Sequence, residues 1–455
     1  MEKVSRPDLR IGIISDPHVG FAGHHISNPY YYGHDQAAVG NQDKWWEYSL
    51  KYFKSRGVDA IVVPGDMANA FNYQTEYATP SAEIAAAEMA RCGKMFRKVF
   101  KGTKTQLICI YGNHDNVTQA AEKLNGGSLT PWEDAFCEPY QDYVLKRVNG
   151  FTFIGGHWNK EDFCKDLIKK EAEKTPDKPV FYIQHSPITG TTCDSFGVES
   201  NDSVKEIVKD YDNVIVLFGH THWPITDERT IWQSAKKGDL KCTAISCSTM
   251  NYSSFSGELI RGDNLWTKHG LILEVSGANI RVERLSFFTP EMLALAKGEK
   301  KRQNLKKCVK SCGADWCFTL KGKEMDWDKR SENATAPEFY KGAKSGFERG
   351  ATLLNVAFPA AAPLNADNDL IDGYYAEAID EKTGKVVSSN HIHTECHIDH
   401  SADFMSRYYQ ITLSNLKPET DYEVRVYARD CWQKQSLNPI VHHITTLKED
   451  KVKTE

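Results

Sequence analysis

The 455-residue sequence contains no apolar run of 18 residues, the length that a membrane-spanning helix needs, so no transmembrane helix is predicted. An excess of basic charge is also missing. The formal net charge is -5, whereas nucleic-acid binding normally requires a basic surface, so we do not expect nucleic acid to be the main partner. Residues 1–7 lack an apolar leader, so we expect no secretory signal there; a cytoplasmic protein and a secreted protein trimmed of its signal both stay open.

The composition is that of an ordinary globular protein, with 40% hydrophobic and 26% charged residues. The chain is too long for one typical hydrophobic core, so we expect two or three domains. It has 12 cysteines, a high count for a cytosolic enzyme. Three of them lie close together, Cys308, Cys312 and Cys317, and for these we favour a disulfide bridge over a metal site.

One pattern recurs five times in the first half of the chain: a short apolar run ends in Asp, Asn or His. Such runs are typical of buried strands. Because strand ends of an α/β sheet meet at one edge, the polar residues after them should gather there. The runs are 10–15, 59–64, 106–111, 180–184 and 214–218, and they are followed by Asp16, His18, Asp66, Asn113, His114, Asp115, His185, His220 and His222.

Seven of these side chains suit a metal site: Asp16, His18, Asp66, Asn113, His185, His220 and His222. Oxygen and nitrogen ligands without a thiolate favour Mn, Fe, Zn, Co or Ni over copper, while the imidazoles disfavour Mg and Ca. Seven ligands are too many for one ion. They suit two ions about 3.5 to 4 Å apart that share a bridging carboxylate.

The order and spacing of these residues resemble the calcineurin-like metallophosphoesterases, over residues 10 to about 288. The motifs are Asp16-x-His18, Gly65-Asp66, Gly112-Asn113-His114-Asp115, His185 and Gly219-His220-Thr221-His222. The resemblance implies an α/β fold of two mixed β-sheets flanked by helices. It also implies that Asp16, His18 and His222 hold one metal, that Asn113, His185 and His220 hold the other, and that Asp66 bridges them.

The resemblance further implies hydrolysis of a phosphoester by a hydroxide held between the two metals. His114 is expected to point away from the ligand Asn113, and the family gives its position the role of general acid or transition-state donor. Asp115 either orients an imidazole or serves as a structural cap. The His18 form of the first motif resembles phosphodiesterase-like branches, including class III cyclic nucleotide phosphodiesterases, whereas purple acid phosphatases lack this His.

The substrate is defined only as a phosphoester, such as a nucleotide or a lipid headgroup. Because no arginine lies within the motifs to clamp a terminal phosphate, we expect a phosphodiester; Asn69 and Arg261 are further candidates for contacts behind the ligands or with substrate. A phosphomonoesterase of the same fold is the nearest alternative. A non-catalytic metal-binding scaffold or adhesion protein is the alternative of another class.

The rest of the chain changes character after the predicted catalytic domain, residues 1–288. Residues 289–336 hold 11 Lys and Arg against 7 Asp and Glu and predict a basic connector, with a docking strip as the alternative. Residues 337–448 predict short alternating strands. Residues 416–422 resemble the corner of fibronectin type III domains, with Tyr422 as its tyrosine and Phe358 where many such domains have Trp. This implies an all-β sandwich that contacts protein or glycan.

Overall fold

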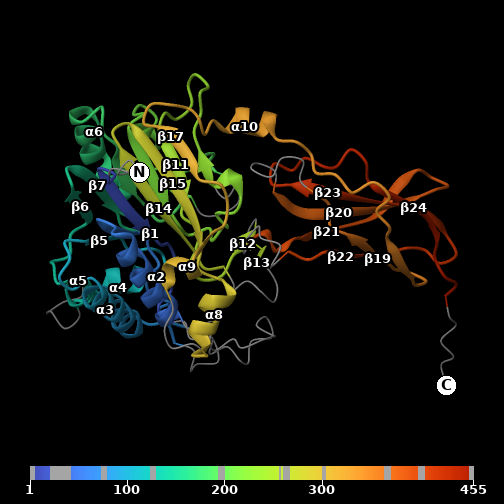
Figure 1. The fold of residues 1–455 in the computed structure, drawn as a ribbon, viewed down its shortest axis with the longest axis horizontal. Helices are drawn as coiled ribbons and strands as arrows, with labels where there is room; N and C mark the ends of the chain where they lie inside the picture. The colour runs from blue at the N-terminus through green and yellow to red at the C-terminus, as the bar shows by residue number, and fades with distance from the viewer. Residues whose placement is uncertain are drawn as a thin grey trace. The chain divides into compact units, whose positions relative to one another are not determined.

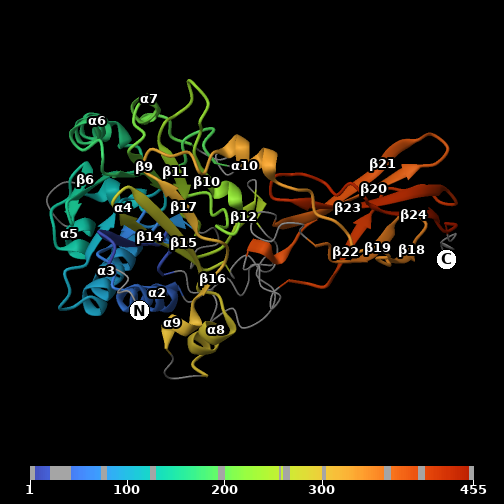
Figure 2. The ribbon, with the colours of Figure 1, turned by 45° about the horizontal axis from the view of Figure 1, so that its top comes forward.

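The computed structural model describes residues 6–20, 42–72, 79–122, 130–192, 200–255, 258–259, 267–299, 304–362, 370–397 and 405–449. Two compact units make up the chain: Met1–Ile225 with Arg229–Asp328, and Thr226–Glu228 with Lys329–Glu455. Figures 1 and 2 show their elements. Among the described helices, none combines the length and the apolar character that crossing a bilayer would require.

The first unit contains two mixed β-sheets. In the first sheet the strand order is β16-β15-β14-β1-β2-β5, and β17 also pairs with β15. Strands β1, β2 and β5 run parallel, so their carboxyl ends lie at one edge of the sheet, while β14 is antiparallel to β1. The strands are β1 (Leu9–Ile13), β2 (Ala60–Val63), β5 (Gln106–Cys109), β14 (His269–Ser276), β15 (Asn279–Ser286), β16 (Lys310–Ser311) and β17 (Trp316–Thr319).

The second sheet has the order β10-β11-β9-β8-β7-β6. Its four middle strands are parallel and its two edge strands are antiparallel. Every residue of β7, β8, β9 and β11 is buried, as expected for parallel strands covered on both faces. The strands are β6 (Tyr143–Val148), β7 (Phe151–Gly156), β8 (Val180–Ile183), β9 (Val214–Phe218), β10 (Ile231–Trp232) and β11 (Thr243–Ser246).

Helices flank the sheets, as Figure 1 shows for α2 to α5 beside β1 and β5. Helix α2 lies close on β1, because a Cβ at Gly12 would meet the Phe53 ring at 2.7 Å. Helix α3 begins after Ser81, whose hydroxyl caps it by accepting from the Ile84 N–H. Helix α6 packs Ile168 and Ala172 into the core of the second sheet. The helices are α2 (Gln42–Arg56), α3 (Ala82–Val99), α4 (Asn116–Ala121), α5 (Pro131–Phe136), α6 (Lys165–Lys174) and α7 (Lys205–Val208), with 3-10 turns η2 (Glu161–Cys164) and η4 (Glu228–Thr230) and short strands β3 (Phe71–Asn72), β4 (Thr79–Pro80), β12 (Ser254–Phe255) and β13 (Glu258–Leu259).

The segment 289–336 contains more regular structure than its lysine-rich sequence indicates. It forms α8 (Pro290–Lys297), α9 (Leu305–Cys308), β16, β17 and α10 (Trp327–Asn333). In β17, Trp316 and Phe318 are buried while Cys317 faces solvent. The predicted disulfide bridge is wrong, since Cys308, Cys312 and Cys317 all carry thiols. The period-two alternation of β17 turns Cys317 toward solvent, whereas Cys308 and Cys312 are buried.

The second unit is an all-β sandwich with sheet orders β18-β19-β22 and β21-β20-β23-β24. The fully buried Phe358 packs against Tyr374, with ring centroids 4.9 Å apart. The Tyr422 hydroxyl accepts a hydrogen bond of 2.9 Å from the Lys417 N–H, which fixes the corner before β23. The strands are β18 (Gly346–Arg349), β19 (Leu354–Pro359), β20 (Ile371–Asp380), β21 (Lys385–His393), β22 (Tyr408–Leu413), β23 (Asp421–Asp430) and β24 (Ile440–Thr445), with the 3-10 turn η6 (Glu395–His397).

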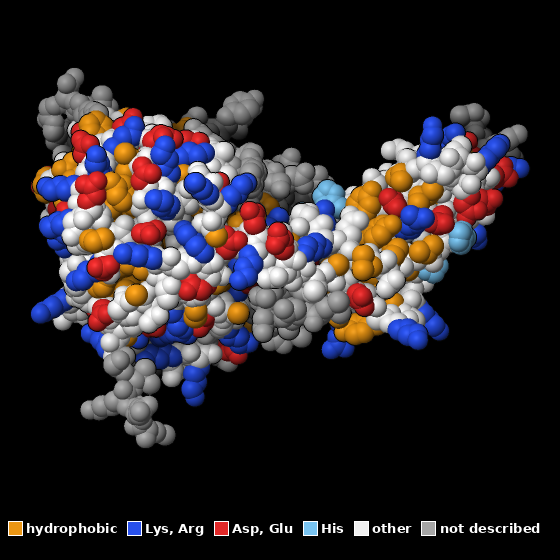
Figure 3. All heavy atoms as spheres, turned by 90° about the horizontal axis from the view of Figure 1, so that it is seen from above, with side chains coloured by type: hydrophobic (Ala, Val, Ile, Leu, Met, Phe, Trp, Pro, Cys, Tyr) orange, Lys and Arg blue, Asp and Glu red, His pale blue; other side chains and the backbone are white. Residues whose placement is uncertain are grey.

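The predicted fold class is confirmed: two mixed sheets flanked by helices are followed in the chain by an all-β sandwich. On the face of the first unit that Figure 3 shows, lysine and arginine side chains are interspersed with aspartate and glutamate. This mixture agrees with the small net charge of the chain.

Candidate metal centre

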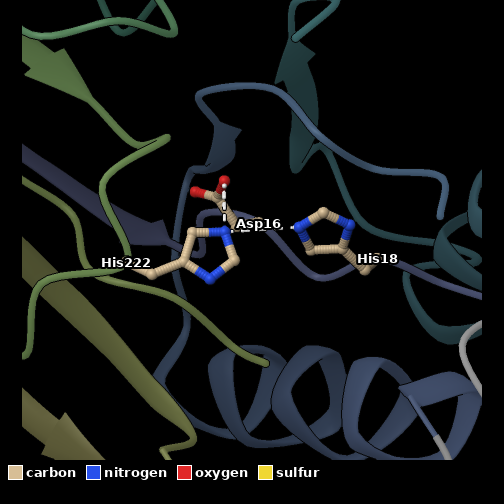
Figure 4. A group of neighbouring side chains, drawn as sticks. All are labelled: Asp16, His18 and His222. Atoms are coloured by element: carbon tan, nitrogen blue, oxygen red, sulfur yellow. Dashed lines mark hydrogen bonds and ion pairs between the residues drawn. The ribbon is translucent and has the colours of Figure 1, made fainter. Parts of the chain in front are cut away.

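The structure brings the predicted ligands together at the carboxyl ends of β1, β2, β5, β8 and β9. Figure 4 shows one group, in which the imidazoles of His18 and His222 face each other beside the carboxylate of Asp16. Asn113 completes the set, because its Oδ1 lies 2.9 Å from His185 Nε2 and 3.0 Å from His220 Nδ1. Three groups have ligand atoms within 4.8 Å of one another: Asp16, His18 and His222; His18, Asp66 and His114; Asp16, Asp66 and His185.

The backbone is left-handed after three of these strands, β1, β2 and β9. The φ angles are 49° at Asp16, 43° at His18, 50° at Asp66, 70° at His220 and 54° at His222. Non-glycine residues rarely adopt this conformation, which costs about 1 to 3 kcal/mol per residue and persists only where surrounding contacts impose it. Such contacts are present: the His18 N–H donates to Asp66 O at 3.0 Å, and the His220 N–H donates to the Asp16 carboxylate at 3.2 Å.

The glycines of the motifs allow the loops to approach closely. A Cβ at Gly65 would lie 2.4 Å from His185 Nδ1. One at Gly112 would lie 2.2 Å from Asp66 Oδ1, and one at Gly219 would lie 2.3 Å from Asp16 Oδ2. Any other residue at these positions would displace a predicted ligand, so the glycine before each polar residue is a steric requirement of the site.

The hydrogen bonds of two imidazoles show that the residues fit metal ions. His222 Nδ1 lies 2.7 Å from Tyr252 O, and His185 Nδ1 lies 2.6 Å from Pro64 O. A proton on each Nδ1 leaves each Nε2 with a lone pair. Those lone pairs face Asp16 Oδ1 at 3.1 Å and Asp66 Oδ2 at 3.3 Å. Nitrogen and oxygen lone pairs at such distances repel each other unless a proton or a metal ion lies between them, and a metal ion would take the place of the proton.

Buried carboxylates and imidazoles in the site shift one another's pKa values. Burial lowers the pKa of His18 well below its usual value, and burial with the neighbouring His185 lowers that of His220 to about 4. Burial alone would raise the pKa of Asp66, but His185 beside it keeps that pKa well below its usual value. Conversely, Asp66 outweighs the effect of burial on His185 and raises its pKa to about 10. A carboxylate is thus ionised among buried imidazoles, two of which favour their neutral, ligating form.

His114 lies nearer to the ligands than we expected. Its ring meets that of His18 edge-on, with centroids 4.5 Å apart, so it does not point away from the site. Its N–H donates to Asp66 Oδ1 at 2.9 Å, and its Nδ1 lies 3.0 Å from the carbonyl oxygen of Asn69. The backbone hydrogen bond to Asp66 places His114 beside the ligands, and the contact of its Nδ1 with the Asn69 carbonyl orients its side chain.

Residues 9–224 match the family model of the calcineurin-like phosphoesterases. They form a calcineurin-like phosphoesterase domain. Its fold implies a dinuclear metal centre, and the family consists of metal-dependent phosphoester hydrolases.

The chain also has distant neighbours among solved structures. A purple acid phosphatase from yellow lupin (Lupinus luteus) seeds is 12% identical, with a TM-score of 0.37 over 61% of this chain and 51% of that chain. A computationally redesigned β-sandwich protein is 22% identical, with a TM-score of 0.17 over 26% of this chain and 94% of that chain. No curated protein matches the sequence.

Asp115 of the phosphoesterase domain stands at the N-cap position of α4, but its side chain binds the backbone of two loops. Its fully buried carboxylate accepts N–H bonds from Met67 at 3.2 Å, Ala68 at 3.0 Å and Gly112 at 3.0 Å. It precedes α4 but makes no side-chain cap bond there. Asp115 therefore joins the loop after β2 to the loop after β5. Arg261 lies outside the described residues.

Two aromatic rings pack against the imidazoles of the phosphoesterase site. Tyr252 lies on His222, with centroids 4.1 Å apart. Trp158 lies 5.7 Å from His185 and 5.4 Å from His220 between centroids. Sequence reasoning missed one further residue, the buried Glu88 of α3, although its signal was present: a carboxylate stands on the face of the helix that also carries Ala85, Met89 and Cys92.

Proposed function

We propose that the calcineurin-like phosphoesterase domain is a two-metal phosphodiesterase. The observation that supports two ions most directly is the position of Asp66, whose Oδ2 lies 3.3 Å from His185 Nε2 and 3.8 Å from His18 Nε2. Asp66 would bridge the ions, since it lies between the two groups of imidazoles. In this proposal Asp16, His18 and His222 hold one ion, and Asn113, His185 and His220 hold the other.

Bound divalent ions would supply charge that neutralises phosphate oxygens and activates water. The chain itself supplies the proton for the leaving group. As the oxygen of a hydroxide ion bonds to phosphorus, the bond to the leaving oxygen breaks with its electron pair, and His114 donates a proton to that oxygen. The N–H bond to Asp66 and the Nδ1 contact with Asn69 O hold His114 for this role.

Preference for a diester is supported by the scarcity of buried cationic side chains that could bind a terminal phosphate. The buried cations among the described residues are Arg284, Lys268 and Lys160. Each has a protein partner: Arg284 donates to Ala314 O and Ile225 O, Lys268 donates to Asn251 O, and Lys160 pairs with Asp142. A monoester dianion carries more charge than a diester and gains more from such a clamp. The phosphomonoesterase is the alternative that the experiment must distinguish.

The test is elemental analysis of the purified protein after Mn²⁺ is supplied, together with turnover of two nitrophenyl esters. Nearly two transition-metal ions per chain and faster turnover of bis(p-nitrophenyl) phosphate than of p-nitrophenyl phosphate are expected. Faster turnover of the monoester would favour the phosphomonoesterase. Absence of bound metal together with absence of turnover would favour a non-catalytic scaffold.

We also propose that residues 337–448 form a fibronectin type III-like module and that the catalytic domain spans 1–288, with 289–336 as a connector whose strands β16 and β17 pair with β15 of the first sheet. The three-plus-four arrangement of strands and the Tyr422 corner support this. Such a module would bind protein or glycan. Binding of the full chain to a glycan array, lost when the chain is ended after residue 336, is the expected result.

A further inference from the structure

Two buried carboxylates bind the four consecutive backbone N–H groups that follow Asp66. Asp115 accepts from Met67 and Ala68, as described above. Glu88 accepts from the next two residues through one oxygen: Oε2 lies 2.9 Å from the Asn69 nitrogen and 2.8 Å from the Ala70 nitrogen. A glutamate is rarely this buried, at 5% exposure, unless partners satisfy it.

Glu88 holds a strained turn. Ala70 has a φ of 68°, a conformation that a residue with a Cβ adopts only under constraint. The other side of the turn is held by the Ser81 N–H, which donates to Ala70 O at 2.8 Å. Ser81 caps α3, and Glu88 lies two helical turns further along the same helix. Both residues that bind the strained turn at Ala70 therefore belong to the cap and the body of α3.

The turn held by Glu88 is the one that contacts His114. The peptide between Asn69 and Ala70 donates its N–H to Glu88 and presents its carbonyl oxygen to His114 Nδ1 at 3.0 Å. A peptide is planar, so fixing its N–H also fixes the direction of its carbonyl. The carboxylate and the imidazole thus bind opposite ends of one rigid unit.

We propose that Glu88 is a positioning residue that sets the orientation of His114 through the Asn69–Ala70 peptide. This inference rests on the proposed function, in which His114 protonates the leaving group. A small displacement of such a donor lowers the rate of hydrolysis for substrates whose leaving oxygen needs a proton. It changes the rate little for substrates whose leaving oxygen departs without one. Glu88 itself touches neither the predicted ligands nor substrate.

Substitution of Glu88 by Leu and by Gln tests the proposal. Leu removes the acceptor, whereas Gln keeps one oxygen that can accept both N–H bonds. With aryl esters whose leaving group ranges from p-nitrophenol to phenol, Glu88→Leu should lower kcat about 10- to 100-fold for phenol and less than about 3-fold for p-nitrophenol, at unchanged KM. Glu88→Gln should restore kcat throughout. Lys94→Leu, at an exposed site of the same helix, is the control.

Amide hydrogen exchange gives a readout that does not depend on turnover. In Glu88→Leu, exchange should accelerate at Ala70, while Asn69 keeps its N–H bond to Val19 O at 3.2 Å and Met67 and Ala68 stay protected by Asp115. Equal loss of rate for all leaving groups, or loss of metal, would show a merely structural role and overturn the proposal. If the wild-type protein binds two metals but hydrolyses no ester, the proposed function fails, and the exchange result still decides whether Glu88 holds the turn.

Discussion

The strand ends of the first unit and the turns of the second place strained backbone in different surroundings. In the phosphoesterase domain, left-handed non-glycine residues such as Asp16, His18 and Asp66 are buried beside ionisable groups. In the sandwich they are Asn415, Glu419 and Gln433, all exposed in turns. In a solvated turn, a strained backbone conformation allows the chain to reverse its direction. At a buried residue with a carboxylate or imidazole side chain, the strained backbone must be imposed by contacts with neighbouring residues. The comparison marks the first region as the one organised for binding.

Removal of the Asp66 carboxylate should have the largest effect on metal binding and turnover. Because its carboxylate lies between both groups of imidazoles, Asp66→Ala should lose both metals and lower kcat/KM by about 10³-fold or more. Metal content by elemental analysis and turnover measure the two effects. Asp177→Ala, at a carboxylate 89% exposed, is the control and should change neither. Retention of two metals in Asp66→Ala would contradict the bridging role.

Removal of His114 should separate metal binding from proton transfer. His114→Ala should keep both metals and lower kcat by about 10²- to 10⁴-fold, with the largest loss for poor leaving groups. His443→Ala is the matched control, since that imidazole is 68% exposed on β24. A His114→Ala variant as fast as wild type on phenyl esters would rule out the role of proton donor.

Apolar runs followed by Asp, Asn or His made the strand ends of the phosphoesterase domain predictable, because buried parallel strands are apolar throughout and polar groups begin where they end. The left-handed backbone at Asp16 could not be predicted from the sequence, because an aspartate side chain does not by itself indicate a positive φ. The roles of Asp115 and Glu88 depend on loops that meet only in the folded chain.

The lysine-rich segment 289–336 shows a second limit of sequence reasoning. Strand β17 has four residues, too few to reveal an alternating pattern among charged neighbours. The disulfide prediction for Cys317 failed for the same reason, because spacing along the chain says nothing about the face of a strand that has not been recognised. In the sandwich, by contrast, β23 has ten residues that alternate clearly, and the sequence predicted alternating strands in this region.

The charge of Glu88 should make the stability of the first unit depend on pH. Burial raises its pKa from 4.5 to about 7, so between these values the folded state holds a proton that the unfolded state has released. The free energy of unfolding therefore falls as pH rises through this interval. Glu88→Gln cannot titrate, so its stability relative to wild type should increase from pH 4.5 to pH 7, by at most about 3 kcal/mol. Urea unfolding of both proteins across this range measures the difference, and parallel pH profiles would contradict it.

A substitution at the Tyr422 corner of the sandwich should have the smallest effect, and it should change stability without changing metal binding. Tyr422→Phe leaves the Lys417 N–H without its partner and should lower the stability of the second unit by about 1 kcal/mol. Tyr408→Phe, at a ring 72% exposed on β22, should change stability by less than about 0.5 kcal/mol. Metal content and turnover should be unchanged in both, because neither ring belongs to the ligand loops. Loss of metal in Tyr422→Phe would mean that the strained strand ends depend on the sandwich, and the two regions could then no longer be treated as separate.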